Sequence, residues 1–375
     1  MSTIAVNAIT DASGGNTASI NGATPTNDNL MGRNRIINGD MRIDQRNAGA
    51  STNNAGGSTT YALDRWAYYA TSGSKFTIQQ SSTAPDGFSN SMIITSSAAT
   101  TIGAGDEYWL IQPIEGFNTA DLNWGTSSAK TVTVSFWVRS SLTGTFGGSI
   151  INGAYNYSYP FSFSISAANT WEQKSVTITA PTAGTWVGAT NGTGLRLVFS
   201  LAAGSTYGNG TVNTWQSGTY KIAPTGATNI LETNGATFYL TGIQLEAGSV
   251  ATSFERVDYG EMLRRCQRYA LMIRTDASMD RFGVGSTVSS TTVQIIVPHP
   301  ASFRAAASSL LTTGTASDYQ VYSTGVTTCS QVPSLGASST YNSRINFITS
   351  GGLTGGQASQ AVGNTSAFLL LSAEL

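Results

Sequence analysis

Few residues in this sequence are suited to catalysis. His299 is the only histidine, and it lies between Pro298 and Pro300. A metal site built from several histidines is therefore excluded, and a Ser-His-Asp triad would have to use this one residue. We interpret His299 as a turn residue, and we predict no catalytic residue, no metal site and no cofactor.

Carboxylates offer one alternative, because glycoside hydrolysis uses two of them on either side of the scissile bond. The densest acidic set is Asp106 with Glu107, followed by Glu115 and Asp121. The residues around this set have the composition of a loop, and the spacing is not diagnostic of a glycosidase. We predict that the protein is not an enzyme, while a surface-polysaccharide depolymerase stays open as an alternative.

Aromatic side chains in polar surroundings indicate a binding function more strongly. Trp137 lies on the polar face of a predicted strand. Trp186, Tyr207 and Trp215 lie in loops rich in Gly, Thr and Asn. Such rings can stack on the C–H face of a sugar, while neighbouring amides and hydroxyls bind its hydroxyl groups. These four rings are candidate glycan-binding residues; the alternative is that they fill subunit contacts or cover the edges of a sandwich.

A calcium ion would need several oxygen ligands, and four acidic residues are conceivable ones. They are Asp40, Asp44, Asp64 and Glu246. Arginines lie close to them in the sequence, so we interpret these carboxylates as partners in salt bridges.

Composition limits the possible partners. Only 10% of the 375 residues are charged, against roughly 25% in typical soluble domains, and the net charge is -1. Without a basic surface, nucleic-acid binding is not expected. No apolar run approaches the ~20 residues of a membrane span, so membrane insertion is not expected either. The absence of a signal peptide and the two widely spaced cysteines, Cys266 and Cys329, indicate folding in a reducing cytosol.

A period of two dominates the chain from Lys75 to Leu245 and predicts many short strands. In the segment 131–139 apolar and polar residues alternate clearly. An aromatic ladder over 155–165 is interrupted by Pro160, which indicates an edge or a bend. The apolar phase flips at Gly242, and a bulge there would restore one buried face. We predict a mainly β protein built on an antiparallel β-sandwich.

Asp258 begins a different pattern, because apolar residues then recur at helical spacing and Glu261 follows at the distance of a capping box. We predict a linking helix over 257–274, with Cys266 on its buried face. Residues 275–375 return to β character, and the apolar segment 368–371 predicts a central or covered strand. The predicted domains are an N-terminal arm (1–32), a sandwich (33–256), the linking helix and a C-terminal β domain (275–375).

Several short motifs taken together resemble a family of bacteriophage tail-fibre and related virion proteins. They are Ile36-Ile37-Asn38-Gly39-Asp40-Met41 with Gln45-Arg46, Leu63-Asp64-Arg65-Trp66, Gly242-Ile243-Gln244-Leu245-Glu246, and the helix from Tyr259 to Tyr269. The similarity covers residues 33–272. It implies a jelly roll like that of carbohydrate-binding modules, in a trimeric appendage of the virion. It defines no sugar-binding residue.

The function that we expect is adhesion to a glycan on the host cell surface by a homotrimeric tail fibre. The arm would attach to other tail or capsid proteins, and the C-terminal domain would be a possible receptor-binding tip. The protein would be assembled in the host cytoplasm and would reside in the virion. A capsid or tail decoration protein without a receptor role is the first alternative.

Overall fold

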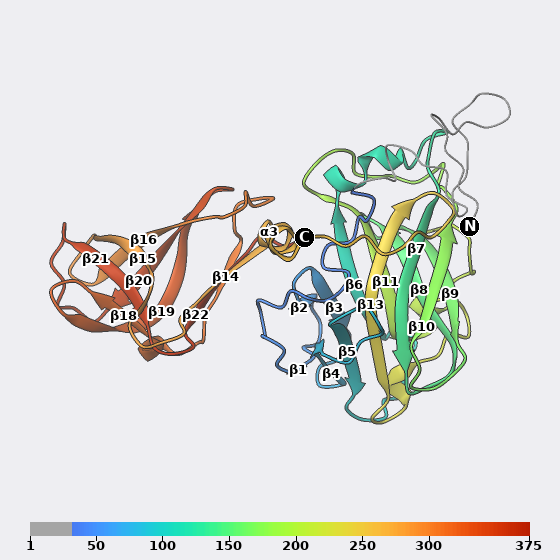
Figure 1. Ribbon diagram of the computed structural model, residues 1–375, viewed down its shortest axis with the longest axis horizontal. Coiled ribbons are helices and arrows are strands. Elements are labelled where there is room, and N and C mark those ends of the chain that lie inside the picture. Colours follow the sequence, from blue (N-terminus) through green and yellow to red (C-terminus); the bar gives the residue numbers. More distant parts are fainter. Residues whose placement is uncertain (1–31) are drawn as a thin grey trace, which may run out of the picture. The chain divides into compact units, whose positions relative to one another are not determined.

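The computed structural model describes residues 32–375 (Figure 1). The predicted N-terminal arm, residues 1–32, therefore lies almost entirely outside the described residues. Residue contacts divide the described chain into two units. The first contains residues 32–42, 51–60 and 67–256; the second contains residues 43–50, 61–66 and 257–375. Two short pieces that we had grouped with the sandwich thus cluster with the C-terminal part of the chain.

The first unit is an antiparallel β-sandwich (Figure 1). One sheet has the strand order β1-β4-β5-β13-β7-β10, and the other has the order β12-β9-β8-β11-β6-β3-β2. The strands are β1 (Thr52–Asn53), β2 (Thr60–Leu63), β3 (Trp66–Ala70), β4 (Phe76–Ser81), β5 (Ser91–Ser96), β6 (Glu107–Glu115), β7 (Val132–Ser140), β8 (Gly144–Asn152), β9 (Tyr157–Ile165), β10 (Glu172–Ile178), β11 (Thr193–Ala203), β12 (Gln216–Ser217) and β13 (Thr237–Ala247). The predicted mainly β fold is confirmed.

Phenylalanine rings from both sheets form the core between them. Phe136 of β7 contacts Phe163 of β9 and Phe199 of β11, with ring centroids 4.9 and 5.0 Å apart. The predicted bulge is also confirmed, because the register between β13 and β7 shifts between Thr241 and Gln244. Gly242 there has φ of +60°, a conformation that glycine adopts without a steric cost. Short helices lie in the loops, namely η1 (Gly116–Asn118), η2 (Ala120–Leu122), α2 (Ser205–Gly208) and η3 (Ile230–Glu232).

The second unit contains helix α3 (Tyr259–Gln267), a three-stranded sheet and a closed barrel. The sheet has the order β14-β22-β17, and the barrel has the order β15-β16-β20-β19-β18-β21. The elements are β14 (Ala270–Arg274), β15 (Asp280–Thr287), β16 (Thr292–Pro298), β17 (Ser309–Leu311), η4 (Ala316–Asp318), β18 (Tyr319–Tyr322), β19 (Val326–Ser338), β20 (Asn342–Thr349), β21 (Ala358–Gly363) and β22 (Phe368–Ser372). The segment 368–371 lies in the central strand of its sheet, as predicted.

The predicted helix begins where expected but ends early. The Asp258 carboxylate accepts hydrogen bonds from the backbone N–H groups of Gly260 and Glu261, at 2.8 and 3.4 Å. The prediction of helix as far as residue 274 is wrong, because β14 (Ala270–Arg274) pairs with β22 along its whole length. The apolar residues Ala270 and Ile273 are compatible with a helix or with a strand. Pairing with the apolar strand β22 stabilises the strand in this segment.

Asn34 and two residues of the short motifs described above, Arg46 and Arg65, have structural partners. The amide of Asn34 donates to the Ile243 carbonyl and accepts from the Leu245 N–H, both at 3.1 Å. In the second unit, the Glu374 carboxylate forms ion pairs with Arg46, at 2.9 Å, and with Arg65. These contacts join segments that are far apart in the sequence, so these residues stabilise the fold.

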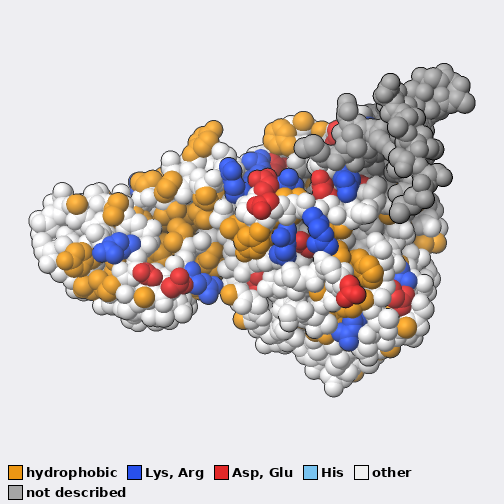
Figure 2. All heavy atoms as spheres, in the orientation of Figure 1, with side chains coloured by type: hydrophobic (Ala, Val, Ile, Leu, Met, Phe, Trp, Pro, Cys, Tyr) orange, Lys and Arg blue, Asp and Glu red, His pale blue; other side chains and the backbone are white. Residues whose placement is uncertain are grey.

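The surface is largely uncharged. Figure 2 shows acidic and basic side chains scattered among hydrophobic side chains, uncharged side chains and backbone on the visible face. No helix within residues 32–375 is both long and apolar enough to cross a membrane.

Candidate functional site

Two of the four predicted aromatic residues lie together at one place in the sandwich. The ring centroids of Trp186 and Trp215 are 5.5 Å apart. Trp124 contacts both, at 4.7 and 5.6 Å, and Tyr157 stacks on Trp215 with an interplanar angle of 6°. We call Trp124, Tyr157, Trp186 and Trp215 the tryptophan cluster. Trp124 was not predicted, because nothing in its sequence neighbourhood marks it as close to the other two indoles.

The indole N–H groups of this cluster bind backbone carbonyls of the sandwich. Trp124 donates to Lys130 O and Trp215 to Thr179 O, both at 2.7 Å. Trp186 donates to Ala183 O at 3.1 Å. The rings are therefore fixed in orientation, and they offer a ligand their faces and edges rather than hydrogen bonds.

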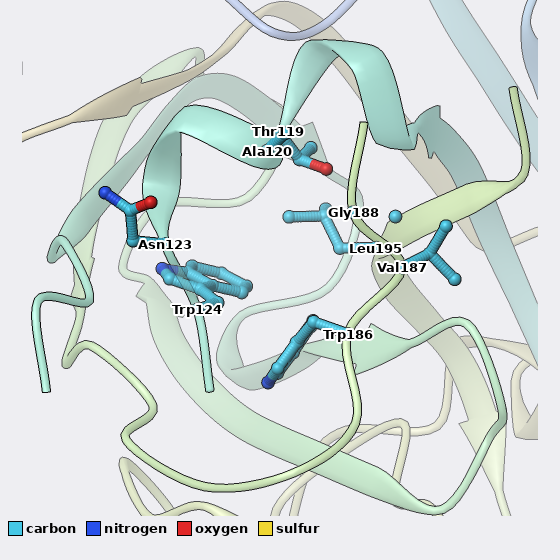
Figure 3. Close-up of a pocket in the computed structure, with 9 residues that line it drawn as sticks. Thr119, Ala120, Asn123, Trp124, Trp186, Val187, Gly188 and Leu195 are labelled. Atoms are coloured by element: carbon cyan, nitrogen blue, oxygen red, sulfur yellow. The ribbon is translucent and has the colours of Figure 1, made fainter. Parts of the chain in front are cut away.

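A small cavity lies beside the cluster (Figure 3). Its volume is about 60 Å³. In Figure 3 the rings of Trp124 and Trp186 lie on one side of it, and Thr119 and Ala120 of the η1–η2 segment lie on the other. The complete lining is Thr119, Ala120, Asn123, Trp124, Trp186, Val187, Gly188, Gly194 and Leu195.

Tyr207 belongs to a second group of rings, on the outer face of the seven-stranded sheet. Tyr69 of β3 faces Trp109 of β6 across the ladder. Leu110, the next residue of β6, is fully buried opposite Phe199, so alternation along the strand places Trp109 on the outer face.

Three tyrosines from loops complete the group. Tyr207 and Tyr155 each lie 5.1 Å from Tyr220, measured between ring centroids. Tyr207 lies in α2, Tyr155 in the turn between β8 and β9, and Tyr220 after β12. We call Tyr69, Trp109, Tyr155, Tyr207 and Tyr220 the tyrosine face.

The Glu107 carboxylate lies at the centre of the tyrosine face. Glu107 is only 5% exposed, and the Tyr220 hydroxyl donates to its two oxygens at 2.8 and 2.9 Å. Burial raises the pKa of Glu107, and the hydrogen bond from Tyr220 counteracts part of that rise. The buried indole N–H of Trp109 makes no hydrogen bond of normal geometry within residues 32–375, yet it lies close enough to lower this pKa as well.

The Glu107 carboxylate also shifts the pKa values of the two neighbouring tyrosine hydroxyl groups. Burial, followed by the negative charge of Glu107, raises the pKa values of Tyr220 and Tyr207. No lysine or arginine within residues 32–375 forms a salt bridge with Glu107. The carboxylate is therefore buried among aromatic rings without a compensating cation.

A short turn connects the two groups of rings. Arg196 lies over the Tyr155 ring, with Cζ 3.8 Å from its centroid, and donates to the carbonyls of Asn152 and Gly153 at 2.8 and 2.9 Å. Tyr155 at one point of this turn belongs to the tyrosine face, and Tyr157 two residues later belongs to the tryptophan cluster.

The fourth predicted residue, Trp137, lies in neither group. It is half-buried on β7, and a Cβ built at Gly242 would come within 3.0 Å of its ring. Trp137 therefore packs over the bulge of β13.

Glu107 and Glu115, two of the acidic residues that we considered for hydrolysis, are widely separated. Glu107 and Glu115 lie at opposite ends of β6. Eight residues of strand span roughly 26 Å, against about 5–9.5 Å between the carboxyl groups of glycosidases. Asp121 pairs with Arg35 at 2.6 Å, and Asp106 accepts from the Gly103 N–H at 2.8 Å.

The four conceivable calcium ligands also have protein partners. Asp40 pairs with Arg42, Glu246 with Arg33, Asp44 binds the N–H groups of Asn47 and Gly49, and Asp64 binds Gln45. In the described part of the chain, no three histidine, cysteine or acidic residues are grouped closely enough to hold a metal ion.

Comparison with known proteins gives weak likenesses. No protein-family model matches the chain, and no curated protein matches it. A putative sugar-binding protein from Bacteroides thetaiotaomicron is 12% identical over 58% of this chain and 100% of its own, with a TM-score of 0.34. A family 11 carbohydrate-binding module from Clostridium thermocellum is 12% identical over 54% of this chain and 98% of its own, with a TM-score of 0.28.

The enzymatically active domain of tailspike protein 4 of bacteriophage CBA120 is also similar. It is 12% identical, with a TM-score of 0.29, over 57% of this chain, which spans only 21% of that domain's length. At these TM-scores the likenesses carry no argument about function, and the strand order described above defines the sandwich by itself.

Proposed function

We propose that the sandwich binds a glycan on the tyrosine face. The observation that supports this most directly is the buried Glu107 carboxylate, surrounded by tyrosine rings and hydroxyls and without a cation. Burying such a charge destabilises a fold, and fold stability alone gives no reason to keep it. Perturbed acidic groups of this kind occur preferentially at functional sites.

Sugars have the chemistry that matches this face. Their hydroxyl groups donate short, strong hydrogen bonds to a carboxylate. Their C–H faces pack on the rings of Tyr69, Tyr155, Tyr207 and Tyr220, which are all half-buried and therefore still reachable. Because Glu107 has no compensating cation, the proposed ligand is a neutral glycan rather than an acidic one.

The proposed role is adhesion without catalysis, in a tail fibre or related virion protein. The motifs described above support this setting by their resemblance to that family. In a trimer three modest sites would act together, so that firm attachment would not need strong single contacts. The partners in this proposal are further copies of the chain, other virion proteins and a host surface glycan. A decoration protein that binds no receptor is the alternative.

The decisive experiment is a screen of the protein on an array of bacterial surface glycans, with calorimetry on each hit. Glu107→Gln should weaken binding at least tenfold while the circular dichroism spectrum stays unchanged. Glu172→Gln, which changes a carboxylate of β10 in the other sheet, is the matched control and should bind like the parent protein. Equal binding by both variants, or no binding to any glycan, would overturn the proposal.

The oligomeric state needs a separate measurement. Light scattering on the purified chain should give the mass of a trimer, and a monomer would favour the decoration alternative.

A further inference from the structure

We infer that the cavity beside the tryptophan cluster takes the acetyl group of a substituted sugar, so that the ligand is an acetylated glycan. This inference rests on the proposed glycan-binding function and specifies its ligand. The acetyl group is carried on nitrogen or on oxygen, since the recognised chemistry is a methyl group next to a carbonyl.

The size of the cavity limits what can enter it. A buried cavity of about 150 Å³ accepts benzene, which has six carbon atoms. The volume here is about 60 Å³, and by proportion it suits about two or three non-hydrogen atoms. A sugar ring is too large, whereas the methyl and carbonyl of an acetyl group have the right size.

The lining has the matching chemistry. The rings of Trp124 and Trp186 and the side chains of Val187 and Leu195 provide apolar contacts (Figure 3). Because the indole N–H groups already bind backbone carbonyls, this wall favours a methyl group over a hydroxyl. The exposed amide of Asn123 at the rim makes no side-chain hydrogen bond within residues 32–375. Its nitrogen points away from the cavity in Figure 3, and rotation about the Cβ–Cγ bond turns it toward an acetyl carbonyl.

The walls of the cavity are held in place before a ligand arrives. A Cβ at Gly125, where φ is +85°, would lie 2.8 Å from the Trp186 ring. A Cβ at Gly184, where φ is +90°, would lie 2.7 Å from the Tyr157 ring. These glycines allow the backbone to close onto the rings, and a preformed cavity loses little entropy when it binds.

One turn connects the cavity to the edge of the tyrosine face, although Glu107 lies at the other end of β6. Tyr155 of the tyrosine face and Tyr157 of the tryptophan cluster are two residues apart in this turn. The Asn152 amide donates to the Thr185 carbonyl at 3.2 Å, which ties this turn to the loop that carries Trp186. A glycan that lies along the turn would meet Tyr155 and the tryptophan cluster, and one of several sugar units would also extend toward Glu107.

The test uses matched neutral probes. Tri-N-acetylchitotriose and cellotriose share the same linkage and differ in their acetamido groups. An O-acetylated bacterial polysaccharide, before and after mild alkali, tests the ester in the same way. Calorimetry on the full chain should show a preference for the acetylated member of at least one pair of about tenfold, as expected for one added apolar group in a fitted pocket.

Two variants separate the cavity from the tyrosine face. Ala120→Leu should fill the cavity from its rim and remove the acetyl preference, while binding of the unacetylated probe changes less than twofold. Val187→Ala should enlarge the cavity and shift the preference toward an N-propionyl probe. The second variant deletes atoms rather than adding them, so it stays informative if the first one does not fold.

The outcomes are distinguishable. If a glycan binds in a Glu107-dependent way with no acetyl preference, the inference is wrong and the proposed function stands. The inference is also wrong if Ala120→Leu keeps the preference. If no glycan binds at all, both are wrong.

Discussion

Two carboxylates of this protein are largely shielded from water but have opposite surroundings. The side chain of Glu374 in the second unit is 5% exposed and pairs with Arg46 and Arg65. The Arg65 guanidinium in turn lies 3.6 Å from the centroid of the Tyr269 ring. Glu107 in the sandwich is buried as a whole residue, and its neighbours are the Tyr220 hydroxyl and aromatic rings.

The difference separates a structural charge from a functional one. Each partner of a buried ion pair depends on the other, and the group as a whole stabilises a particular arrangement of the chain. A buried carboxylate without a cation costs stability and leaves acceptor oxygens that a ligand can use. We therefore expect mutations at the two residues to change stability in opposite directions.

The largest expected effect is that of Glu374→Ala. It leaves two buried arginines without their counter-ion, so it should destabilise the second unit by about 3–5 kcal/mol. Chemical denaturation followed by circular dichroism measures this change. Glu261→Ala, which removes an exposed partner of Arg265, should change stability by less than about 0.5 kcal/mol. A similar small effect at Glu374 would contradict the structural role.

Tyr220→Phe should have the next largest effect. It removes the one hydroxyl that donates to both oxygens of Glu107. A buried charged acceptor then lacks its donor, which should cost about 1–3 kcal/mol of sandwich stability. Tyr239→Phe on the other sheet is the control and should be nearly neutral. If the two variants unfold at the same denaturant concentration, water must satisfy the Glu107 carboxylate.

Glu107→Gln should have a smaller effect of the opposite sign. The amide keeps an oxygen for the Tyr220 hydroxyl and avoids the burial of a charge. We expect the sandwich to gain up to about 1 kcal/mol at pH 7 while glycan binding falls. Thermal unfolding of the two proteins side by side measures the gain. A clear loss of stability would mean that Glu107 is part of the structural framework.

The smallest effect is a pH dependence. The pKa of Glu107 is raised in the folded state above its usual 4.5. The folded protein therefore binds more protons between these two values, and its stability should fall as pH rises through that window. Comparing the parent protein with Glu107→Gln over pH 4–8 isolates this group, and the difference in stability should vanish at the acid end. Glycan binding should weaken toward acid pH in the parent protein only.

Local patterns in the sequence predicted much of the framework. The alternation over 131–139 corresponds to β7, and the phase flip at Gly242 corresponds to the bulge of β13, because both depend on which neighbouring residues share a face. The helix prediction was wrong beyond residue 267, and from residue 270 onward pairing with β22 decides the structure. The pairing of β14 with β22, almost 100 residues later in the sequence, leaves no signal in the local spacing of apolar residues.

The sites were harder to predict for the same reason. Trp186 and Trp215 stood out because they are large rings in polar loops. Their partner Trp124 comes from a distant segment. The tyrosine face draws its five rings from β3, β6, α2 and two loops, and only the folded sheet brings them around Glu107. We noted Glu107 for its acidic neighbours, whereas its surroundings in the structure are aromatic.

The ion pairs of Glu374 also affect the order in which the chain can fold. They connect residues separated by 309 and 328 positions in the sequence. During synthesis at roughly 5–20 residues per second, Arg46 and Arg65 wait tens of seconds for their partner. The segments 43–50 and 61–66 can take their final places only after residue 374 has left the ribosome. Until then these two arginines stay hydrated, so these segments join the second unit late in its synthesis.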